Sequence, residues 1–180
     1  MARIKPLRLE DIEDAELRDL IRQVDAAGVP GGAFARILAA DPRSAKPTLR
    51  VLLESFTTGD IDLRLKELLR LQNAQQVGEP CSLAMRSTPA KQAGLTDAMI
   101  AAALGDYEDS DLFPESWKVA MRYTEQMYLD ATKVDRAMYD ELRKHYSEAQ
   151  IMQIGPYVSF CQGVHLFMRS FDATAADAAA

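Results

Sequence analysis

Apolar residues recur at every third or fourth position along almost the whole chain, and no stretch shows the strict alternation of a half-buried strand. This periodicity predicts an all-α protein, a multi-helix bundle of about eight or nine helices, many of them short. The predicted helices span residues 9–27, 33–40, 47–56, 61–77, 80–93, 96–104, 114–130, 135–146 and 147–171.

Glycine and proline divide these helices into larger units. The run Gly28-Val29-Pro30-Gly31-Gly32 is the strongest helix-breaking cluster in the sequence. We expect it to separate an N-terminal helical arm, 1–32, from a helical domain, 33–172. The alanine-rich tail, 173–180, is expected to be disordered.

Capping residues and prolines indicate where individual helices begin and bend. Asp60 can cap the helix that follows it, since its carboxylate can accept hydrogen bonds from the first amides. Ser147, with Gln150 three residues later, matches a capping box. Pro89 is expected to kink its helix, and Gly155-Pro156 to kink or split the last one, because proline removes an amide donor and crowds the preceding turn.

The charge and hydropathy of the chain limit the classes of partner that it can bind. The 21 basic residues are scattered and are outnumbered by 27 acidic ones, giving a net charge of −6. This argues against a nucleic-acid surface, which needs clustered cations. No apolar run is long enough to cross a bilayer, and the start MARIKPLRLEDIED lacks the apolar stretch of a secretory signal. We expect a cytoplasmic protein that binds neither nucleic acid nor membrane.

The two cysteines do not form a recognisable metal or redox motif. Cys81 and Cys161 stand far apart, neither belongs to a Cys-x-x-Cys pair, and a reducing cytosol disfavours a disulfide between them. The sequence also lacks a metal-ligand cluster and a glycine-rich phosphate loop. We therefore expect no metal and no cofactor.

The helices on either side of Gly78 are the best candidate for a site. If they form an antiparallel hairpin with equal rise per residue, Glu67 and Arg86 come level across it. Glu67 lies on an apolar stripe, where a carboxyl group needs a partner or favours its protonated form, as a general acid requires. The simpler alternative is a surface ion pair of Glu67 with Arg64 or Arg70, and a purely structural salt bridge for Arg86.

Further polar residues surround this pair. Glu79, Ser82 and Arg86 would share one face of a continuous helix, at a spacing of three and four residues. Cys81 points about 100° away, at a helix start that would lower the pKa of a thiol, although a small buried apolar role is the commoner one. His165 is a candidate second proton carrier, or a core residue with a satisfied ring. His145 is expected to face solvent.

The stretch LRLKELLRLQNAQQVGEPCSLAMRSTPAKQAGLTDAMIAAA resembles the signature hairpin of the carboxymuconolactone decarboxylase and alkylhydroperoxidase D-like family. That family carries a glutamate in LR-x-x-E-L, then Cys-x-x-Cys after eleven residues and a histidine after three more. The C-terminal segment YDELRKHYSEAQIMQIGPYVSFCQGVHLFMRSF also resembles its closing helices, so the likeness covers about 33–171.

The resemblance assigns roles by position. Glu67 matches the proton-relay glutamate, Glu79 and Ser82 stand at the two redox cysteines, and Arg86 stands at the relay histidine. Cys81 falls between the cysteine positions and inherits neither role. Disulfide-based peroxidase chemistry needs an attacking thiolate and a resolving thiol, and therefore looks lost.

The resemblance implies a cofactor-independent lyase, a decarboxylase acting on a small organic acid or lactone. Arg86 would hold a substrate carboxylate and a protonated Glu67 would supply the proton. Two alternatives stay open: an alkylhydroperoxidase or peroxiredoxin-like antioxidant activity that uses Cys81, and a non-catalytic ligand-binding or assembly protein. Proteins of this family commonly assemble, so the resemblance also implies a homo-oligomer, a trimer or hexamer.

Overall fold

The computed structural model describes residues 3–171 and contains only helices in that range. Ten of them are α-helices, and two short 3-10 turns cover Leu9–Asp11 and Ala131–Lys133. The α-helices are α1 Ala15–Ala27, α2 Gly32–Leu38, α3 Pro42–Thr57, α4 Leu63–Val77, α5 Pro80–Ala84, α6 Thr88–Gln92, α7 Asp97–Leu104, α8 Glu115–Asp130, α9 Arg136–Arg143 and α10 Glu148–Ser170. The predicted all-α class is confirmed, with more and shorter helices than expected. The tail 173–180 lies outside the described residues.

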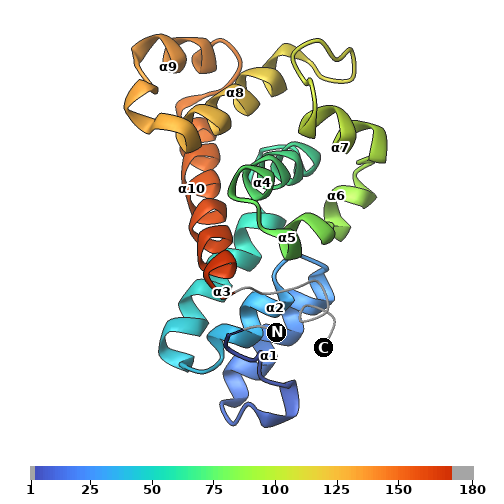
Figure 1. The fold of residues 1–180 in the computed structure, drawn as a ribbon, viewed down its shortest axis with the longest axis vertical. Helices are drawn as coiled ribbons and strands as arrows, with labels where there is room; N and C mark the ends of the chain where they lie inside the picture. The colour runs from blue at the N-terminus through green and yellow to red at the C-terminus, as the bar shows by residue number, and fades with distance from the viewer. Residues whose placement is uncertain (1–2, 172–180) are drawn as a thin grey trace.

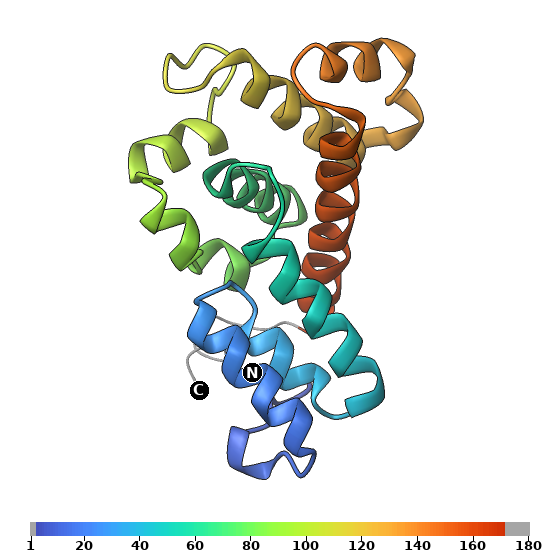
Figure 2. The ribbon, with the colours of Figure 1, turned by 180° about the vertical axis from the view of Figure 1, so that it is seen from behind.

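The helices form two tiers joined by α10. Helices α1, α2 and α3 lie together at one end, while α5, α6, α7 and α8 lie around α4 at the other, and α9 packs against α8 and α10 (Figure 1, Figure 2). Helix α4 packs most extensively against α10 and α8, and α1 packs against α3. Within the expected N-terminal arm, α1 contributes Leu17, Ile21 and Val24 to the same core as the rest of the chain.

Helix α4 is buried on every side. Every residue from 65 to 74 is buried, including the polar Lys66, Glu67, Arg70 and Asn73. Burying such groups is costly unless each one finds a partner. The centre of the bundle therefore holds a polar network where most small domains have only apolar side chains.

Three helix starts differ from the sequence prediction because other residues cap them. Asp14 accepts a hydrogen bond from the Leu17 amide, so α1 begins at Ala15 and not near residue 9. Asp41 caps α3, which therefore begins at Pro42 and contains Pro47. Asp62, and not Asp60, caps α4 through the Arg64 amide. A carboxylate next to the first amides decides the start in each case.

The largest correction concerns the helix expected over 80–93, which is broken in two. Helix α5 ends at Ala84, Met85 adopts an extended conformation, and Ser87 caps α6 by accepting from the Ala90 amide. Pro89 lies in the first turn of α6, where its missing amide costs nothing. Arg86 therefore lies in the break and does not share a helix face with Glu79 and Ser82.

The last helix runs unbroken through Gly155-Pro156, so the expected split does not occur. Its start has the predicted capping box, in which Ser147 and Gln150 exchange hydrogen bonds. Helix α10 carries Cys161 and His165 alongside α4 (Figure 1).

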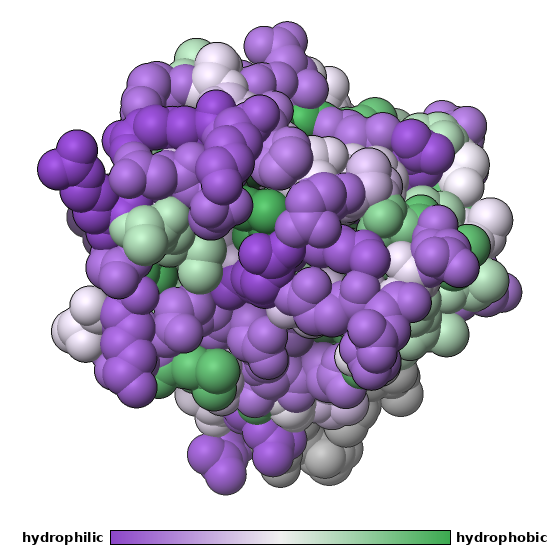
Figure 3. Space-filling view, turned by 90° about the horizontal axis from the view of Figure 1, so that it is seen from above, coloured by the Kyte–Doolittle hydropathy of each residue, from purple (hydrophilic) through white to green (hydrophobic). Residues whose placement is uncertain are grey.

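The surface offers few broad apolar areas at the α8 and α9 end. From that side polar residues dominate, and apolar ones form small separate patches (Figure 3). Across residues 3–171, no helix combines the length and the apolar character that crossing a membrane requires. Nor do three His, Cys, Asp or Glu side chains gather closely enough in that range to hold a metal ion.

Candidate functional site

A buried ion pair on α4 forms the centre of the polar network. Arg70 donates from Nε to Oε2 of Glu67 and from Nη2 to Oε1, both at 2.8 Å. The two side chains are 2% and 0% exposed, so the pair is removed from solvent. The partner of Glu67 is thus one of the two arginines named by the simpler sequence hypothesis, but the pair is buried and not on the surface.

The same pair holds the broken segment between α5 and α6. Two further donors of Arg70 reach the carbonyl oxygens of Ser82, from Nη1 at 2.9 Å, and Met85, from Nη2 at 3.0 Å. The Ser87 amide donates to Oε1 of Glu67 at 2.9 Å. A helix break leaves backbone groups without intrahelical partners. Glu67 and Arg70 supply those partners inside the core.

The predicted pair of Glu67 with Arg86 is wrong. The half-buried Arg86 directs Nη1 to the carbonyl oxygens of Leu83 and Met85, and it forms no ion pair with Glu67. Because the Glu67 oxygens accept three hydrogen bonds, the side chain positions Arg70 and is not placed to donate a proton. Arg86 therefore points to its own backbone.

Glu79, Cys81 and Ser82 form a helix start. Buried Glu79 caps α5 by accepting from the Cys81 amide at 3.0 Å and from the Ser82 amide at 2.6 Å. Cys81 is fully buried, and no disulfide joins it to Cys161. A peroxide-reducing thiol has to be accessible. Use of Cys81 in such chemistry would require the core to open.

His165 faces α4 from α10. Its Nδ1 lies 2.7 Å from Oδ1 of Asn73, so the ring donates from Nδ1 and keeps Nε2 as an acceptor. Burial, with a smaller contribution from the Arg70 guanidinium, lowers the pKa of His165 to about 3. The imidazole is therefore neutral near pH 7.

A small inner cavity brings several of these groups together. It has a volume of about 20 Å³, enough for about one water molecule. Four polar side chains face it, those of Arg70, Ser82, Cys161 and His165. The remaining lining is Pro30, Gly31, Phe34, Leu52, Phe56, Met85, Phe160, Val164 and Met168. We call this space the inner cavity.

Several solved structures share this arrangement of helices. A variant of the debrominase Bmp8 in complex with 2,3,4-tribromopyrrole superposes with a TM-score of 0.80 and 17% identity, covering 98% of this chain and 93% of that one. The apo form of the debrominase superposes with a TM-score of 0.80 and 18% identity, covering 98% of this chain and 94% of that one. A third structure is the alkylhydroperoxidase AhpD core of an uncharacterized peroxidase-related protein from Ralstonia eutropha JMP134. It superposes with a TM-score of 0.75 and 14% identity, covering 95% of this chain and 90% of that one.

The chain has the alkylhydroperoxidase D-like fold. The sequence matches no protein-family model and no curated protein. Identities of 14–18% therefore show a shared fold, and the activity has to be argued from the residues of this chain.

Within this alkylhydroperoxidase D-like fold, the sequence identified two of the four polar residues at the inner cavity. Ser82 and His165 were predicted as site residues, and they do come together. Glu67, Glu79, Cys81 and Arg86 do not line the inner cavity. Sequence reasoning missed Arg70, considered only as a surface partner, and Cys161. The signal for Cys161 was its position one helical turn before His165, because residues four apart share a face.

The Cys161 thiol is also held in its neutral form. Burial raises its pKa to about 12, although Arg70 and a hydrogen bond with Tyr157 act in the opposite direction. A neutral thiol is a poor nucleophile. Cys161 therefore serves as part of the cavity wall.

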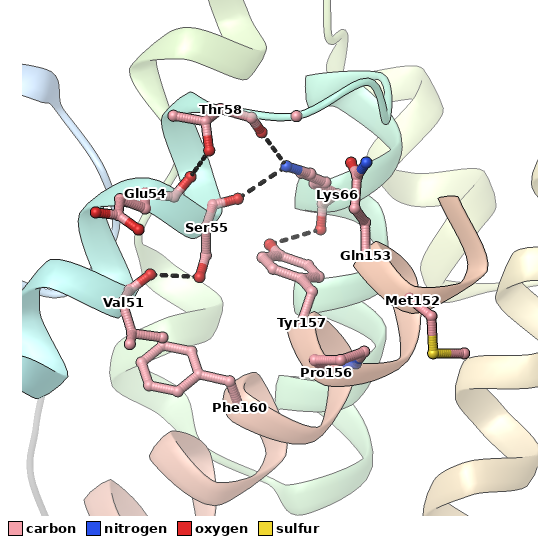
Figure 4. A pocket seen from close by; sticks show the side chains of 11 residues that line it. Val51, Glu54, Ser55, Thr58, Lys66, Met152, Gln153, Pro156, Tyr157 and Phe160 are labelled. Carbon is pink, nitrogen blue, oxygen red and sulfur yellow. Dashed lines mark hydrogen bonds between the residues drawn. The ribbon is translucent and has the colours of Figure 1, made fainter. Parts of the chain in front are cut away.

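An outer cavity of about 270 Å³ is lined by Tyr157 and Phe160, among others (Figure 4), and Phe160 also lines the inner cavity. Its most unusual residue is Lys66, whose ammonium donates to the carbonyl oxygens of Ser55 at 2.9 Å and Thr58 at 2.6 Å. Burial lowers the pKa of Lys66. Because both carbonyls belong to the C-terminal end of α3, the ammonium acts as a helix cap. We assign Lys66 to the fold and not to a reaction.

Proposed function

We propose that this protein is an enzyme that removes CO₂ from a small organic acid or lactone bearing a carboxylate, at the inner cavity. One observation carries the proposal: a guanidinium and a neutral imidazole, both buried, face the same small and otherwise mostly apolar space. A cation that binds a carboxylate and a group that carries a proton are the two functions such a reaction needs.

Arg70 is the group we assign to the substrate carboxylate. Arginine has five N–H donors. Nε donates a hydrogen bond to Glu67, and one N–H of Nη1 donates to the Ser82 carbonyl. The two N–H groups of Nη2 donate to Glu67 and to the Met85 carbonyl. One donor of Nη1 is left over for a ligand. Glu67 fixes the direction of that donor and so acts as a positioning residue, in place of the proton-donor role predicted for it.

His165 is the group we assign to proton transfer. Its pKa is low because burial and the positive charge of Arg70 disfavour the imidazolium. A bound carboxylate adds a negative charge beside the ring and raises that pKa, so a larger fraction of the complex carries an imidazolium that has taken its proton from solvent. When the bond between the carboxylate and its carbon breaks, CO₂ leaves and the electron pair stays on carbon. The imidazolium then donates its proton there, which balances the reaction.

A shared fold supports a small-molecule substrate. The debrominase Bmp8, whose fold is similar, was solved with 2,3,4-tribromopyrrole, a small planar compound. A protein from Agrobacterium tumefaciens of unknown function, suggested to be an antioxidant defence protein AhpD, is also similar, with a TM-score of 0.67 and 17% identity over 76% of this chain and 93% of that one. Burial of Cys81 speaks against antioxidant chemistry here. A cytoplasmic location and a homo-oligomer, a trimer or hexamer, remain part of the proposal.

The test is a panel of acids labelled with ¹³C at the carboxyl carbon, covering keto acids, aryl acids and carboxylated lactones. We expect at least one of them to release labelled bicarbonate under multiple turnover, followed by NMR. Binding without release of label for every acid on the panel would contradict the decarboxylase proposal and favour the non-catalytic alternative.

A further inference from the structure

An apolar groove on the surface runs beside the inner cavity and has no part in the mechanism above. It has a volume of about 320 Å³ and lies between α2 and α10, with Leu38, Gly163 and Phe167 among its walls. None of the residues that line it carries a charge. Its size falls within the range of small-molecule sites.

The groove and the inner cavity are neighbours. Three residues, Phe34, Phe160 and Val164, line both spaces. Phe160 and Val164 are only half-buried, so their side chains can change rotamer without the core opening. A thin wall of three apolar side chains therefore separates an uncharged groove from Arg70 and His165.

We propose that the groove holds the apolar tail of the substrate, whose carboxylate passes this wall and reaches Arg70. The inference rests on the proposed acid-binding site, and it names the substrate class: an amphiphilic carboxylic acid with an extended alkyl or arylalkyl tail. The inner cavity, at about 20 Å³, holds about one water molecule, so the carboxylate enters it only as the half-buried Phe160 and Val164 move aside, and no tail fits there. The groove supplies the missing volume, and its lack of charge matches a hydrocarbon tail.

The occupant could otherwise be a second copy of this chain, because Phe167 is 38% exposed at the groove and Leu166 is 51% exposed beside it. Continuity with a polar cavity favours the small acid. A protein surface would cover the groove without needing a passage toward a buried guanidinium. The experiment below separates the two occupants.

The test uses straight-chain carboxylates from butanoate to dodecanoate, and the alcohols of equal length, in calorimetric titrations. We expect the affinity of the acids to rise about fourfold per methylene until the groove is filled. The alcohols should bind at least about tenfold more weakly than the acids, because they lose the ionic contact with Arg70.

The variant that tests the groove is Gly163→Trp. A Cβ at this position meets no atom within 4 Å, so the new side chain enters open space in the groove. We expect decanoate to bind at least about tenfold more weakly and butanoate to bind within about twofold of the original protein. Leu166→Trp, on the same helix but outside the groove, is the matched control and should change neither value.

Three results would overturn the inference: affinity that does not depend on chain length, unchanged decanoate binding to Gly163→Trp, or a change of sedimentation in that variant without a change in binding. The last result would assign the groove to a second copy. Length-dependent binding with no turnover of any acid would instead support the groove while contradicting the decarboxylase proposal.

Discussion

Replacing Arg70 with methionine is expected to lower the free energy of unfolding by about 3–5 kcal/mol, measured by urea denaturation. Methionine fills a similar space but has no donors. The change leaves the Glu67 carboxylate buried without its counter-ion, and it removes the partner of the Ser82 and Met85 carbonyl oxygens. A buried charge without a partner costs much more than the loss of a surface pair.

The control is Arg64→Met on the same helix. Arg64 pairs with Asp62, and about a third of each side chain is exposed, so the loss should be within about 1 kcal/mol. The double variant of Glu67→Gln with Arg70→Met should be less destabilised than the sum of the single variants, because it leaves no uncompensated charge. Equal, small effects for Arg70→Met and Arg64→Met would show that the buried pair does not hold the broken segment.

His165→Gln is expected to reduce kcat on a substrate found in the panel by at least about 100-fold, with a smaller change in binding of the acid. A glutamine side chain is long enough to form a hydrogen bond with Asn73, but it cannot accept and release a proton as imidazole does. Arg70 still binds the carboxylate, so the loss should fall on the chemical step and not on affinity.

His145→Gln is the matched control, because His145 is the other histidine of the chain and is exposed. It should leave kcat unchanged. Arg86→Gln should also keep most of the activity, since Arg86 does not line the inner cavity. Full activity of His165→Gln, or loss of activity in Arg86→Gln, would show that the reaction does not take place at the inner cavity.

The fold class was predictable because helical periodicity extends along the chain and caps such as Ser147 mark helix starts. The predicted helix bounds failed where a nearby capping residue, or a partner for free backbone groups, determines where a helix begins or breaks. The sequence predicted that Pro89 would kink one continuous helix. In the structure the core carboxylate of Glu67 and the guanidinium of Arg70 satisfy the freed backbone groups, so a full break is stable.

The site was only half predictable for the same reason. Glu67 stood out as a carboxylate on an apolar stripe, which correctly marked it as buried and in need of a partner. Arg86 was assigned as that partner by assuming equal rise along both helices. An extended residue such as Met85 advances about twice as far as a helical one, and it also turns the chain, so that assumption fails.

Arg70 was considered only as a surface partner of Glu67, because nothing in the sequence marks α4 as the central helix. Only the packing of α10 and α8 around α4 shows that all its faces are buried, and such long-range contacts leave no local pattern in the sequence. Once α4 is central, an arginine three residues from a buried glutamate becomes the natural partner.

The most direct test of the acid-binding site is the protonation of His165, followed by the ¹⁵N shifts of its imidazole in NMR, with and without a saturating carboxylate. The exposed His145 is the internal reference. We expect the free protein to keep a neutral ring down to about pH 4, consistent with a pKa of about 3. With the acid bound, the ring should take up a proton at least about one pH unit higher. An imidazole that stays equally neutral in both titrations would contradict a carboxylate bound between Arg70 and His165.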